Sequence, residues 1–357
     1  MLKPIKQAGL RITGALAINS LVRNSRWRRR RVAILCYHGV SLNEEHEWDP
    51  RYYISPATLE RRFQILRNNY NVLPLGEAVR RLYEGTLPAR SVAITFDDGC
   101  YDFYRQAFPL LKKFELPATV YLTTFYCRHP KPVFEMFCHY LVWKGRNTFP
   151  GGLLLDQEST PDLTSEAGRR RVGAAVVTSA RRRGLSLAEK DALAEELARQ
   201  LGVDYRAAVS SRILQLMTPD EVTEVASAGI DIQLHTHRHR VPAGRDAFFR
   251  EIADNRRSIR EMTGSDAATV HFCYPSGDYR PDLLPWLKDQ GIVSATTCET
   301  GLAGPRQHPL LLPRVTDTGN LTQIEWEGWL DGVSEAVRCS LRATPGQSPP
   351  RAPRDAP

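Results

Sequence analysis

The sequence predicts an α/β fold in which parallel strands are covered on the outside by helices. Three observations support this prediction: short apolar runs alternate with helical patterns, two helical patterns start at an N-capping residue followed by proline, and some of the patterns stop at glycine. The 357 residues are 42% hydrophobic and 25% charged, which is the composition of a globular protein with a large core. A chain of this length forms either about two domains or one α/β barrel.

The first part of the regular pattern lies between residues 32 and 123. Ser55 and Pro56 supply an N-cap and a first-turn proline, and apolar residues after them repeat at helical spacing, so a helix starts there. The segment 43–53 before this helix is expected to be a polar loop. The other expected elements are strands at 32–37, 71–75, 91–96 and 117–123 and helices at 76–85 and 101–114.

The pattern returns at Thr218, where a hydroxyl N-cap, a first-turn proline and two acidic residues predict a helix that ends at Gly229. The run 230–234 alternates apolar and polar residues, as a strand with one buried face does. The remaining expected elements are helices at 246–262 and 282–290 and strands at 269–274, 292–298 and 310–315.

Between about residues 127 and 216 the alternation stops, and we interpret this segment as a helical insertion into the barrel-like domain. It contains two charged helical patterns, at 166–183 and 187–201. A lid over a functional site and a plain structural elaboration are equal alternatives for its role. The main domain is expected to span 32–340, followed by a tail at 341–357 whose proline and arginine content predicts disorder.

The net charge of +8 is concentrated in an N-terminal arm, residues 1–31, and in the stretch 169–183. The arm contains the run Arg26-Trp27-Arg28-Arg29-Arg30-Arg31, which is either simply solvated or attracted to anionic lipid headgroups. Nucleic acid is not an expected partner, because no nucleic-acid-binding motif accompanies the run. The arm also mixes basic residues with apolar ones, as an amphipathic surface helix does: Leu2, Ile5, Leu10, Leu16 and Leu21.

The cysteines and the N-terminal segment predict a location. Seven cysteines, an odd number without CxxC spacing, argue against a disulfide framework and a cysteine zinc site and favour a reducing compartment. The mildly apolar segment 10–22 is too short and too polar to span a bilayer, and no small-residue cleavage site follows it. We therefore expect a cytoplasmic protein that can associate with a membrane surface.

The strand 91–96 leads directly into Asp97, Asp98 and Gly99, and the rest of the chain is organised around this junction. Taken alone, the triplet fits a turn that closes a hairpin. At the end of a buried strand, however, neighbouring carboxylates can face different groups. One of them can then bind a metal while the other moves a proton.

Histidines follow two other predicted strands. His38 comes after the first strand, and His235, His237 and His239 come after the strand that ends at Leu234. Active sites of α/β barrels collect where the carboxyl ends of the strands meet. Two histidines four residues apart share a face if the chain turns helical, and with one carboxylate they form a three-ligand metal site with open positions. The alternatives are a surface histidine cluster and an extended segment in which all three histidines share a face.

Two motifs make this pattern specific. Thr95-Phe96-Asp97-Asp98-Gly99, followed downstream by His235-Thr236-x-x-His239, resembles the polysaccharide deacetylase family, also called the NodB-homology domain or carbohydrate esterase family four. The resemblance covers about residues 32–319, with the insertion outside it. It implies a deformed, incomplete (β/α) barrel, a divalent metal, usually Zn²⁺, held by Asp98, His235 and His239, and Asp97 as the general base.

Other parts of the sequence depart from the family pattern. The late Leu-x-His motif, whose histidine is the acid in many members, is absent: the late strand contains Leu312-Pro313-Arg314-Val315, and His308 precedes it. The Arg-x-Pro-Tyr motif is replaced by Cys273-Tyr274-Pro275-Ser276-Gly277. Together with Tyr37-His38-Gly39-Val40, these departures resemble the subgroup that includes poly-N-acetylglucosamine deacetylases, in which the motif order is permuted. The resemblance implies that His38 is the catalytic acid.

Two further residues are grouped as candidates for substrate binding. The backbone N–H near Ser276 is expected to help bind an oxyanion. Arg314 is the second candidate, and it can also orient Asp97 in place of the missing motif arginine.

The resemblance implies a metal-dependent hydrolase that removes N-acetyl groups from N-acetylglucosamine-type sugars in a polysaccharide or a lipid-linked glycan. An acetamide is a poor electrophile, so a metal that polarises its carbonyl and lowers the pKa of water suits the reaction. The alternatives are an O-deacetylase or another C–N hydrolase with the same site, and a non-catalytic carbohydrate-binding protein on the same fold. The presence of both aspartates with His235 and His239 argues against the non-catalytic alternative.

Overall fold

The computed structural model describes residues 18–147, 163–264 and 268–342, which form two compact units. Unit 1 consists of the described residues of Met1–Arg128 and Met217–Ser348. Unit 2 consists of the described residues of His129–Leu216.

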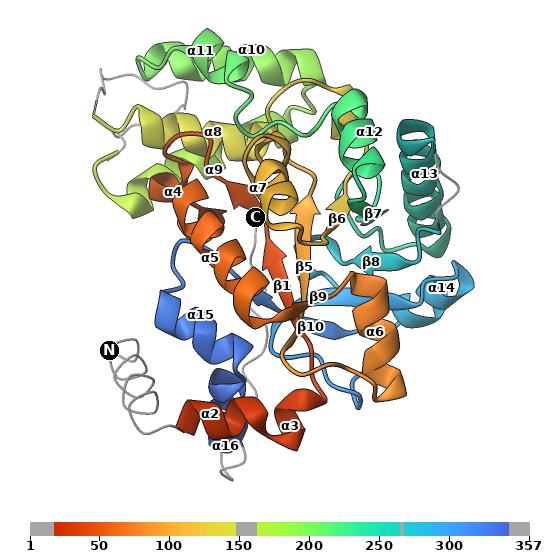
Figure 1. Cartoon of the computed structure of the whole chain (residues 1–357). Coiled ribbons are helices and arrows are strands. Elements are labelled where there is room, and N and C mark those ends of the chain that lie inside the picture. Colours follow the sequence, from red (N-terminus) through yellow and green to blue (C-terminus); the bar gives the residue numbers. More distant parts are fainter. Residues whose placement is uncertain (1–17, 148–162, 265–267, 343–357) are drawn as a thin grey trace. The chain divides into compact units, whose positions relative to one another are not determined.

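Unit 1 is built around a ring of parallel strands (Figure 1). The strands follow the order β1-β10-β9-β8-β7-β6-β5, and β1 pairs with β5 as well as with β10, which closes the ring. A short further strand, β4 (Asn71–Val72), pairs with the first residues of β5. The ring strands are β1 (Ala33–Tyr37), β5 (Ser91–Asp98), β6 (Thr119–Leu122), β7 (Asp231–Leu234), β8 (His271–Cys273), β9 (Ser294–Thr300) and β10 (Leu312–Thr316).

This architecture confirms the predicted α/β fold with a deformed, incomplete barrel. In the described part of unit 1 the ring contains seven strands, whereas a complete (β/α) barrel has eight. The ring is also uneven. β7 and β8 share a single registered pair, Leu234 with Phe272, and the register between β9 and β10 shifts between Leu312 and Arg314.

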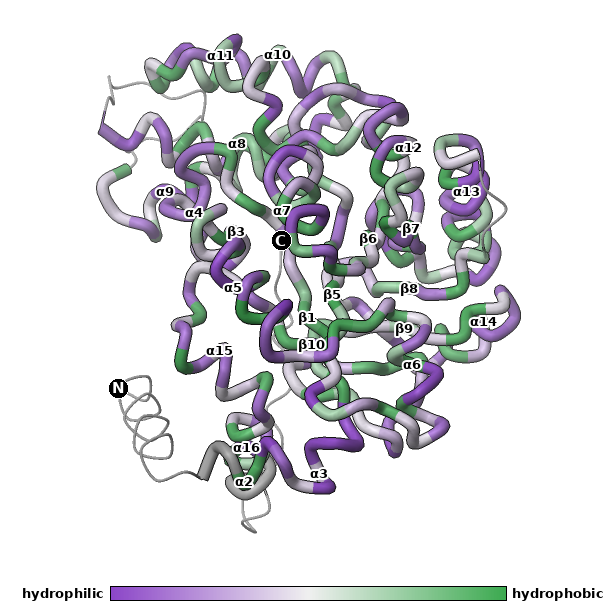
Figure 2. Tube along the Cα trace, in the orientation of Figure 1, coloured by the Kyte–Doolittle hydropathy of each residue, from purple (hydrophilic) through white to green (hydrophobic). Residues whose placement is uncertain are grey.

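The strand sequences are apolar because the strands are buried on both faces. All five residues of β1 and the first seven of β5 are buried. Helices cover the outside of the ring, and large side chains such as Tyr121, which is fully buried, fill the inside. Figure 2 shows hydrophobic residues concentrated along these strands.

The helices of unit 1 start and end where the sequence supplies caps. Ser55 accepts a hydrogen bond from the Thr58 N–H at the start of α5, and Thr218 and Glu221 form a capping box at the start of α12. Helix α6 ends at Gly85, which adopts a left-handed conformation with φ 73°. The helices are α2 (Ile18–Asn24), α3 (Arg26–Arg29), α4 (Glu45–Trp48), α5 (Pro56–Asn69), α6 (Leu75–Glu84), α7 (Phe108–Phe114), α12 (Pro219–Ser227), α13 (Arg245–Thr263), α14 (Leu283–Asp289), α15 (Gln323–Leu330) and α16 (Val333–Arg342).

One expectation about unit 1 is confirmed with a local change, and another is corrected. Residues 101–114 are helical as expected, but Phe103–Ala107 form a π-helical turn before α7. Pro109 explains the π-helical turn, because it has no N–H to donate and its ring crowds a carbonyl of the preceding turn. The segment 43–53, expected to be a loop, contains α4 and leads into β3 (Tyr53–Ile54), which pairs with β2 (Gly39–Val40). This pairing requires glycine at position 39, because a Cβ there would lie 2.2 Å from the Tyr53 ring.

The basic run at residues 26–31 is part of unit 1 and is not uniformly solvated. The Arg28 guanidinium is buried and donates hydrogen bonds of 2.7 Å to the carbonyls of Leu330 and Arg31. Its hydrophobic neighbour Trp27 stacks with the Arg31 guanidinium, 4.1 Å from the ring centroid. The exposed arginines of the run are Arg26, Arg29 and Arg30.

Two expectations fall outside the described residues: the amphipathic pattern from Leu2 to Leu16, and the tail from residue 343 onward. The preceding residues 341 and 342, assigned to the tail, belong to α16. None of the described helices is both long enough and apolar enough to cross a membrane.

Unit 2 is helical. The helical patterns expected at 166–183 and 187–201 correspond to α9 and α10, which start at the N-caps Ser165 and Ser186. Leu141, Val172 and Leu197 are buried in this unit, one from each of three helices. The helices are α8 (Phe134–Lys144), α9 (Glu166–Arg182), α10 (Leu187–Gln200) and α11 (Tyr205–Ser210).

Candidate active site

The register of the parallel strands brings the polar strand ends to one edge of the ring. Asp98 pairs with Leu122 of β6, and Leu122 pairs with Leu234 of β7. Leu234 in turn pairs with Phe272 of β8. The residues that follow these pairs therefore meet at the carboxyl edge, where the active sites of α/β barrels lie.

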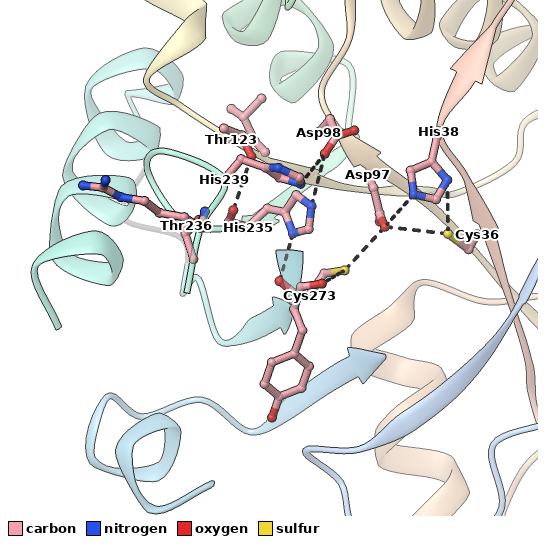
Figure 3. A network of polar contacts seen from close by, with 12 residues as sticks. Cys36, His38, Asp97, Asp98, Thr123, His235, Thr236, His239 and Cys273 are labelled. Atoms are coloured by element: carbon pink, nitrogen blue, oxygen red, sulfur yellow. Dashed lines mark hydrogen bonds and ion pairs between the residues drawn. The ribbon is translucent and has the colours of Figure 1, made fainter. Parts of the chain in front are cut away.

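Asp98, His235 and His239 form a cluster at this edge (Figure 3). The Nε2 atoms of both histidines lie 3.2 Å from Asp98 Oδ1, and one potential ligand atom of each side chain lies within 4.8 Å of the others. The structure thus brings together the three residues to which the resemblance assigns the metal. Two imidazole nitrogens and a carboxylate oxygen are donors that suit Zn²⁺.

The hydrogen bonds around the cluster leave its potential metal-ligand atoms, the Nε2 atoms and Asp98 Oδ1, facing one another. His235 Nδ1 lies 2.8 Å from the Cys273 carbonyl oxygen, which can only accept, so in the neutral ring Nδ1 carries the proton and Nε2 does not. Asp98 Oδ1 is buried and receives no hydrogen bond. Lone pairs that face each other in a buried site are stabilised by a cation or a proton between them. The donor set therefore fits a divalent cation.

Electrostatics also favour an anionic carboxylate in this cluster. Burial alone would raise the pKa of Asp98, but His239 and His235 lower it well below its usual value. Burial alone would lower the pKa of His235, but Asp98 and Asp97 raise it above its usual value. Asp98 is therefore present in the form that binds a cation.

Asp97 lies beside the cluster and is held by Arg314. The guanidinium donates one hydrogen bond to each carboxylate oxygen, both with N–O distances of 2.7 Å. The thiols of Cys273 and Cys36 lie 3.4 and 3.7 Å from Asp97 Oδ2. Burial alone would raise the pKa of Asp97, but the charge and the hydrogen bonds of Arg314 lower it below its usual value. Asp97 is therefore an ionised carboxylate that is held in one orientation by Arg314.

Among the described residues, two other sets of three potential ligand atoms also lie within 4.8 Å of one another, and both contain Asp97 and a cysteine. They are Cys36, His38 and Asp97, and Asp97, His235 and Cys273. Burial raises the pKa of the Cys36 and Cys273 thiols well above the usual value. A thiol that keeps its proton is a poor metal ligand. The cluster around Asp98 is therefore the better candidate for the metal.

His38 lies on the other side of Asp97, at the end of β1. Its Nε2 is 3.5 Å from Asp97 Oδ2, and its side chain is 20% exposed. Burial lowers the pKa of His38, although Asp97 and Asp98 act in the opposite direction. The ring is therefore mainly neutral at neutral pH, and its Nε2 faces the Asp97 carboxylate.

Tyr52 is a residue of this site that sequence reasoning missed. Its hydroxyl donates a hydrogen bond of 2.5 Å to Asp98 Oδ2, and its ring lies beside His38 with centroids 4.8 Å apart. The two oxygens of Asp98 thus have separate partners, because Oδ1 faces the histidines. The signal that could have found Tyr52 is the run Tyr52-Tyr53-Ile54, since aromatic and β-branched residues favour a strand over the expected loop.

The two residues grouped for substrate binding lie in different surroundings. Arg314 is 1% exposed and its guanidinium is occupied by Asp97, so its contact is with the proposed base and not with a substrate. Ser276 is exposed in the turn after β8, where it adopts a left-handed conformation with φ 55°.

The two remaining histidines near the motifs have other partners. His237 Nδ1 lies 2.8 Å from Thr124 Oγ1, and burial lowers the pKa of this histidine. His308 Nδ1 accepts a hydrogen bond of 3.1 Å from the Leu310 N–H. Neither belongs to a compact group of three donors among the described residues.

Comparison with known proteins identifies related sequences. The family model described as polysaccharide deacetylase matches residues 84–139 and 192–295. These ranges include Asp97, Asp98, His235 and His239. The poly-beta-1,6-N-acetyl-D-glucosamine N-deacetylase of Escherichia coli K12 is 31% identical over 103 residues, 28% of this chain and 15% of that protein. The protein of the same name from Staphylococcus epidermidis is 36% identical over 74 residues, 20% of this chain and 26% of that protein. The chain thus matches about a quarter or less of these relatives.

Two solved structures share the fold. The Streptococcus pyogenes deacetylase PplD, in complex with acetate, matches with a TM-score of 0.54 and 19% identity, over 84% of this chain and 98% of that chain. IcaB from Ammonifex degensii matches with a TM-score of 0.53 and 19% identity, over 84% of this chain and 97% of that chain. At these identities the likeness establishes the fold.

Proposed function

Because this chain belongs to the polysaccharide deacetylase family, we propose that it is a metal-dependent hydrolase that removes N-acetyl groups from N-acetylglucosamine-type sugars in a polysaccharide or a lipid-linked glycan. One observation carries the proposal: two neighbouring carboxylates have different partners. Asp98 faces two histidines, whereas Asp97 is held by Arg314. The first is thereby available to a metal and the second to a proton.

Asp98, His235 and His239 would hold the metal. We propose Zn²⁺, because this donor set suits it and three protein ligands leave a coordination position open. When bound, such a cation polarises an amide carbonyl and lowers the pKa of water. The surrounding residues prepare the ligands: the Cys273 carbonyl fixes the proton of His235 on Nδ1, and Tyr52 holds the second oxygen of Asp98.

Asp97 acts as the general base and His38 as the acid. Asp97 takes a proton from the attacking water while Arg314 keeps the carboxylate oriented. Since burial lowers the pKa of His38, its ring is neutral before the reaction and can receive this proton across the 3.5 Å that separates it from Asp97. His38 then delivers the proton to the amine that leaves the acetyl carbon, so the proton taken from water ends on the product.

The proposed substrate class follows from the relatives. The E. coli and S. epidermidis proteins are named for N-deacetylation of poly-β-1,6-N-acetyl-D-glucosamine. An O-deacetylase or another C–N hydrolase would use the same groups, and the products separate these candidates. N-deacetylation releases acetate and a free amine in equal amounts, whereas O-deacetylation releases acetate without an amine.

Metal analysis coupled to an amine-release assay on N-acetylated glycans tests the proposal. The purified chain is expected to hold one zinc ion and to release amine. Asp97→Asn should keep the metal and lose turnover, because an amide cannot accept the proton. His239→Ala should lose the metal, and full occupancy in that variant would contradict the assignment of the ligands. If the protein binds metal but releases neither amine nor acetate from any of the glycans tested, a carbohydrate-binding protein would be favoured.

We further propose that the protein is cytoplasmic and contacts an anionic membrane surface through Arg26, Arg29 and Arg30. Each basic residue near such a surface contributes about 1 kcal/mol. Because Arg28 is buried, deletion of the whole arm would disturb unit 1, and replacing the three exposed arginines with glutamine is the better test. Binding to phosphatidylglycerol vesicles should fall while turnover stays unchanged. Equal vesicle binding by the wild type and by the variant with three glutamines would exclude membrane attachment through these arginines.

A further inference from the structure

Helix α13 presents two buried polar side chains to the segment that carries the ligand histidines. Glu251 and Asn255 are 2% and 0% exposed. They are four residues apart, so they lie on the same face of the helix. Buried polar groups of this kind are kept in place by hydrogen bonds, and each of these side chains has a partner at or next to one of the histidines.

Both the oxygen and the nitrogen of the Asn255 side-chain amide form hydrogen bonds near the end of β7. Its Oδ1 accepts a hydrogen bond of 3.0 Å from the His235 N–H. Its Nδ2 donates to the Leu122 carbonyl at 2.9 Å and to Thr124 Oγ1 at 3.0 Å. A single side chain thus ties the end of β6 to the backbone of the first histidine ligand.

Glu251 contacts both chain neighbours of the second ligand. Its Oε2 accepts a hydrogen bond of 2.8 Å from the Arg238 N–H, and its Oε1 accepts one of 2.9 Å from the Arg238 guanidinium. Oε1 also lies 3.3 Å from Arg240 Nε. Because Arg238 and Arg240 flank His239, this carboxylate holds the backbone just before His239 and contacts the side chain of the residue after it.

The segment between the ligands needs such support, because its backbone is strained. Thr236 and His239, both on the segment that follows His235 in Figure 3, have φ angles of 61° and 53°. Non-glycine residues rarely adopt this left-handed conformation, and they keep it only where surrounding contacts over-determine it. The Arg240 N–H also donates to Thr236 Oγ1 at 3.1 Å. From outside the segment, Glu251 and Asn255 bind the N–H groups of Arg238 and His235, and the Phe125 N–H donates to the His237 carbonyl at 2.8 Å.

We propose that Glu251 and Asn255 are positioning residues that hold His235 and His239 as a preformed pair and so set the metal affinity of the site. This inference rests on the proposed metal site. Neither residue reaches the metal itself. Their effect is transmitted through the backbone at positions 235 and 238, since ligands that are already in place lose less freedom on binding.

The test is the Zn²⁺ dissociation constant of the metal-free full chain, measured by competition with a chelating dye. Glu251→Leu and Asn255→Leu should weaken binding about 10- to 100-fold, the usual effect of removing a residue that orients a ligand. Glu251→Gln, which keeps an acceptor for the Arg238 N–H, should weaken binding less. Two controls on α13 should keep wild-type affinity: Glu261→Gln, which is exposed, and Ile252→Val, which removes one buried methyl group.

The outcomes separate this inference from the proposed function. Absence of Zn²⁺ binding by the wild-type chain would overturn both. Normal binding by the wild type and by Glu251→Leu would overturn the positioning role alone. Thermal unfolding of each variant shows whether it is folded. If the leucine variants do not fold, equal affinity of Glu251→Gln and Glu261→Gln overturns the inference, and a selective loss in Glu251→Gln supports it.

Discussion

Arg314 and Asp97 form a bidentate ion pair inside the strand ring, with both N–O distances at 2.7 Å. The side chains are 1% and 3% exposed, so neither can turn to another partner without leaving a buried charge uncompensated. Arg314 lies on β10, 217 positions after Asp97 on β5. Closure of the ring therefore decides the orientation of the proposed base.

The first prediction concerns this pair. Arg314→Met should lower turnover about 100-fold or more, because Asp97 loses the group that orients it and keeps it anionic. The metal content should not change, since Arg314 does not contact the Asp98 cluster. Turnover must be expressed per folded molecule, because breaking a buried pair costs about 3–5 kcal/mol.

Arg314→Lys is the matched control for charge. A lysine keeps the positive charge but cannot donate to both oxygens at once, so its turnover should lie between those of the wild type and Arg314→Met. Wild-type turnover in Arg314→Met would show that Asp97 does not depend on the pair.

The end of β5 illustrates what could be predicted from the sequence. A short apolar run predicts a buried strand, and the alternation of such runs with helical patterns predicts a parallel sheet. Because Asp98 and His235 each come at the end of such a strand, they are expected at the same edge of the sheet. The candidate metal cluster also follows from local motifs, because each motif ends one strand.

The remaining parts of the site depend on contacts that no local pattern encodes. The bond between Arg314 and Asp97 needs the ring to close, and the position of Tyr52 depends on β2 and β3, which have two residues each. Such strands are too short to show an alternation of apolar and polar residues. Glu251 and Asn255 look like ordinary polar residues of an amphipathic helix, and only the packing of α13 against β7 shows that they are buried.

The second prediction concerns Tyr52. Tyr52→Phe should weaken metal binding about 10-fold, because Asp98 loses the hydrogen bond that fixes its second oxygen. The packing of the ring against His38 is kept, so the fold and the thermal midpoint should change little. A dye-competition titration measures the effect. Tyr53→Phe removes the neighbouring hydroxyl and serves as control, and equal affinities of the two variants would exclude a role for the Tyr52 hydroxyl.

The third prediction concerns His38. His38→Gln should slow product formation by about 10²- to 10⁴-fold, the usual contribution of a positioned acid, because the leaving amine is no longer protonated. The zinc content should stay at the wild-type level, since His38 is not in the Asp98 cluster. His308→Gln is the matched control and should keep wild-type turnover. A loss of metal in His38→Gln would assign this histidine to the ligands instead.

The last prediction concerns Asp317, at the end of β10. Its Oδ2 accepts a hydrogen bond of 2.9 Å from the hydroxyl of Tyr37, the residue before His38, and lies 3.4 Å from Arg62 Nε. Burial raises the pKa of Asp317 to about 6, although Arg62 and Tyr37 act in the opposite direction. The folded state therefore holds the proton more tightly than the unfolded chain, whose aspartates titrate near a pKa of about 3.9.

The sign of the pH dependence follows from this order of pKa values. The contribution of Asp317 to stability is complete below about pH 4 and is lost as the pH rises through about 6, and two pKa units correspond to about 3 kcal/mol. Denaturant unfolding of the metal-free chain between pH 4 and 7 should show that Asp317→Asn lacks this decline. The exposed control Asp282→Asn should retain it. A wild-type chain that gains stability over this interval, relative to Asp317→Asn, would mean that the charge of Arg62 outweighs burial and keeps Asp317 ionised.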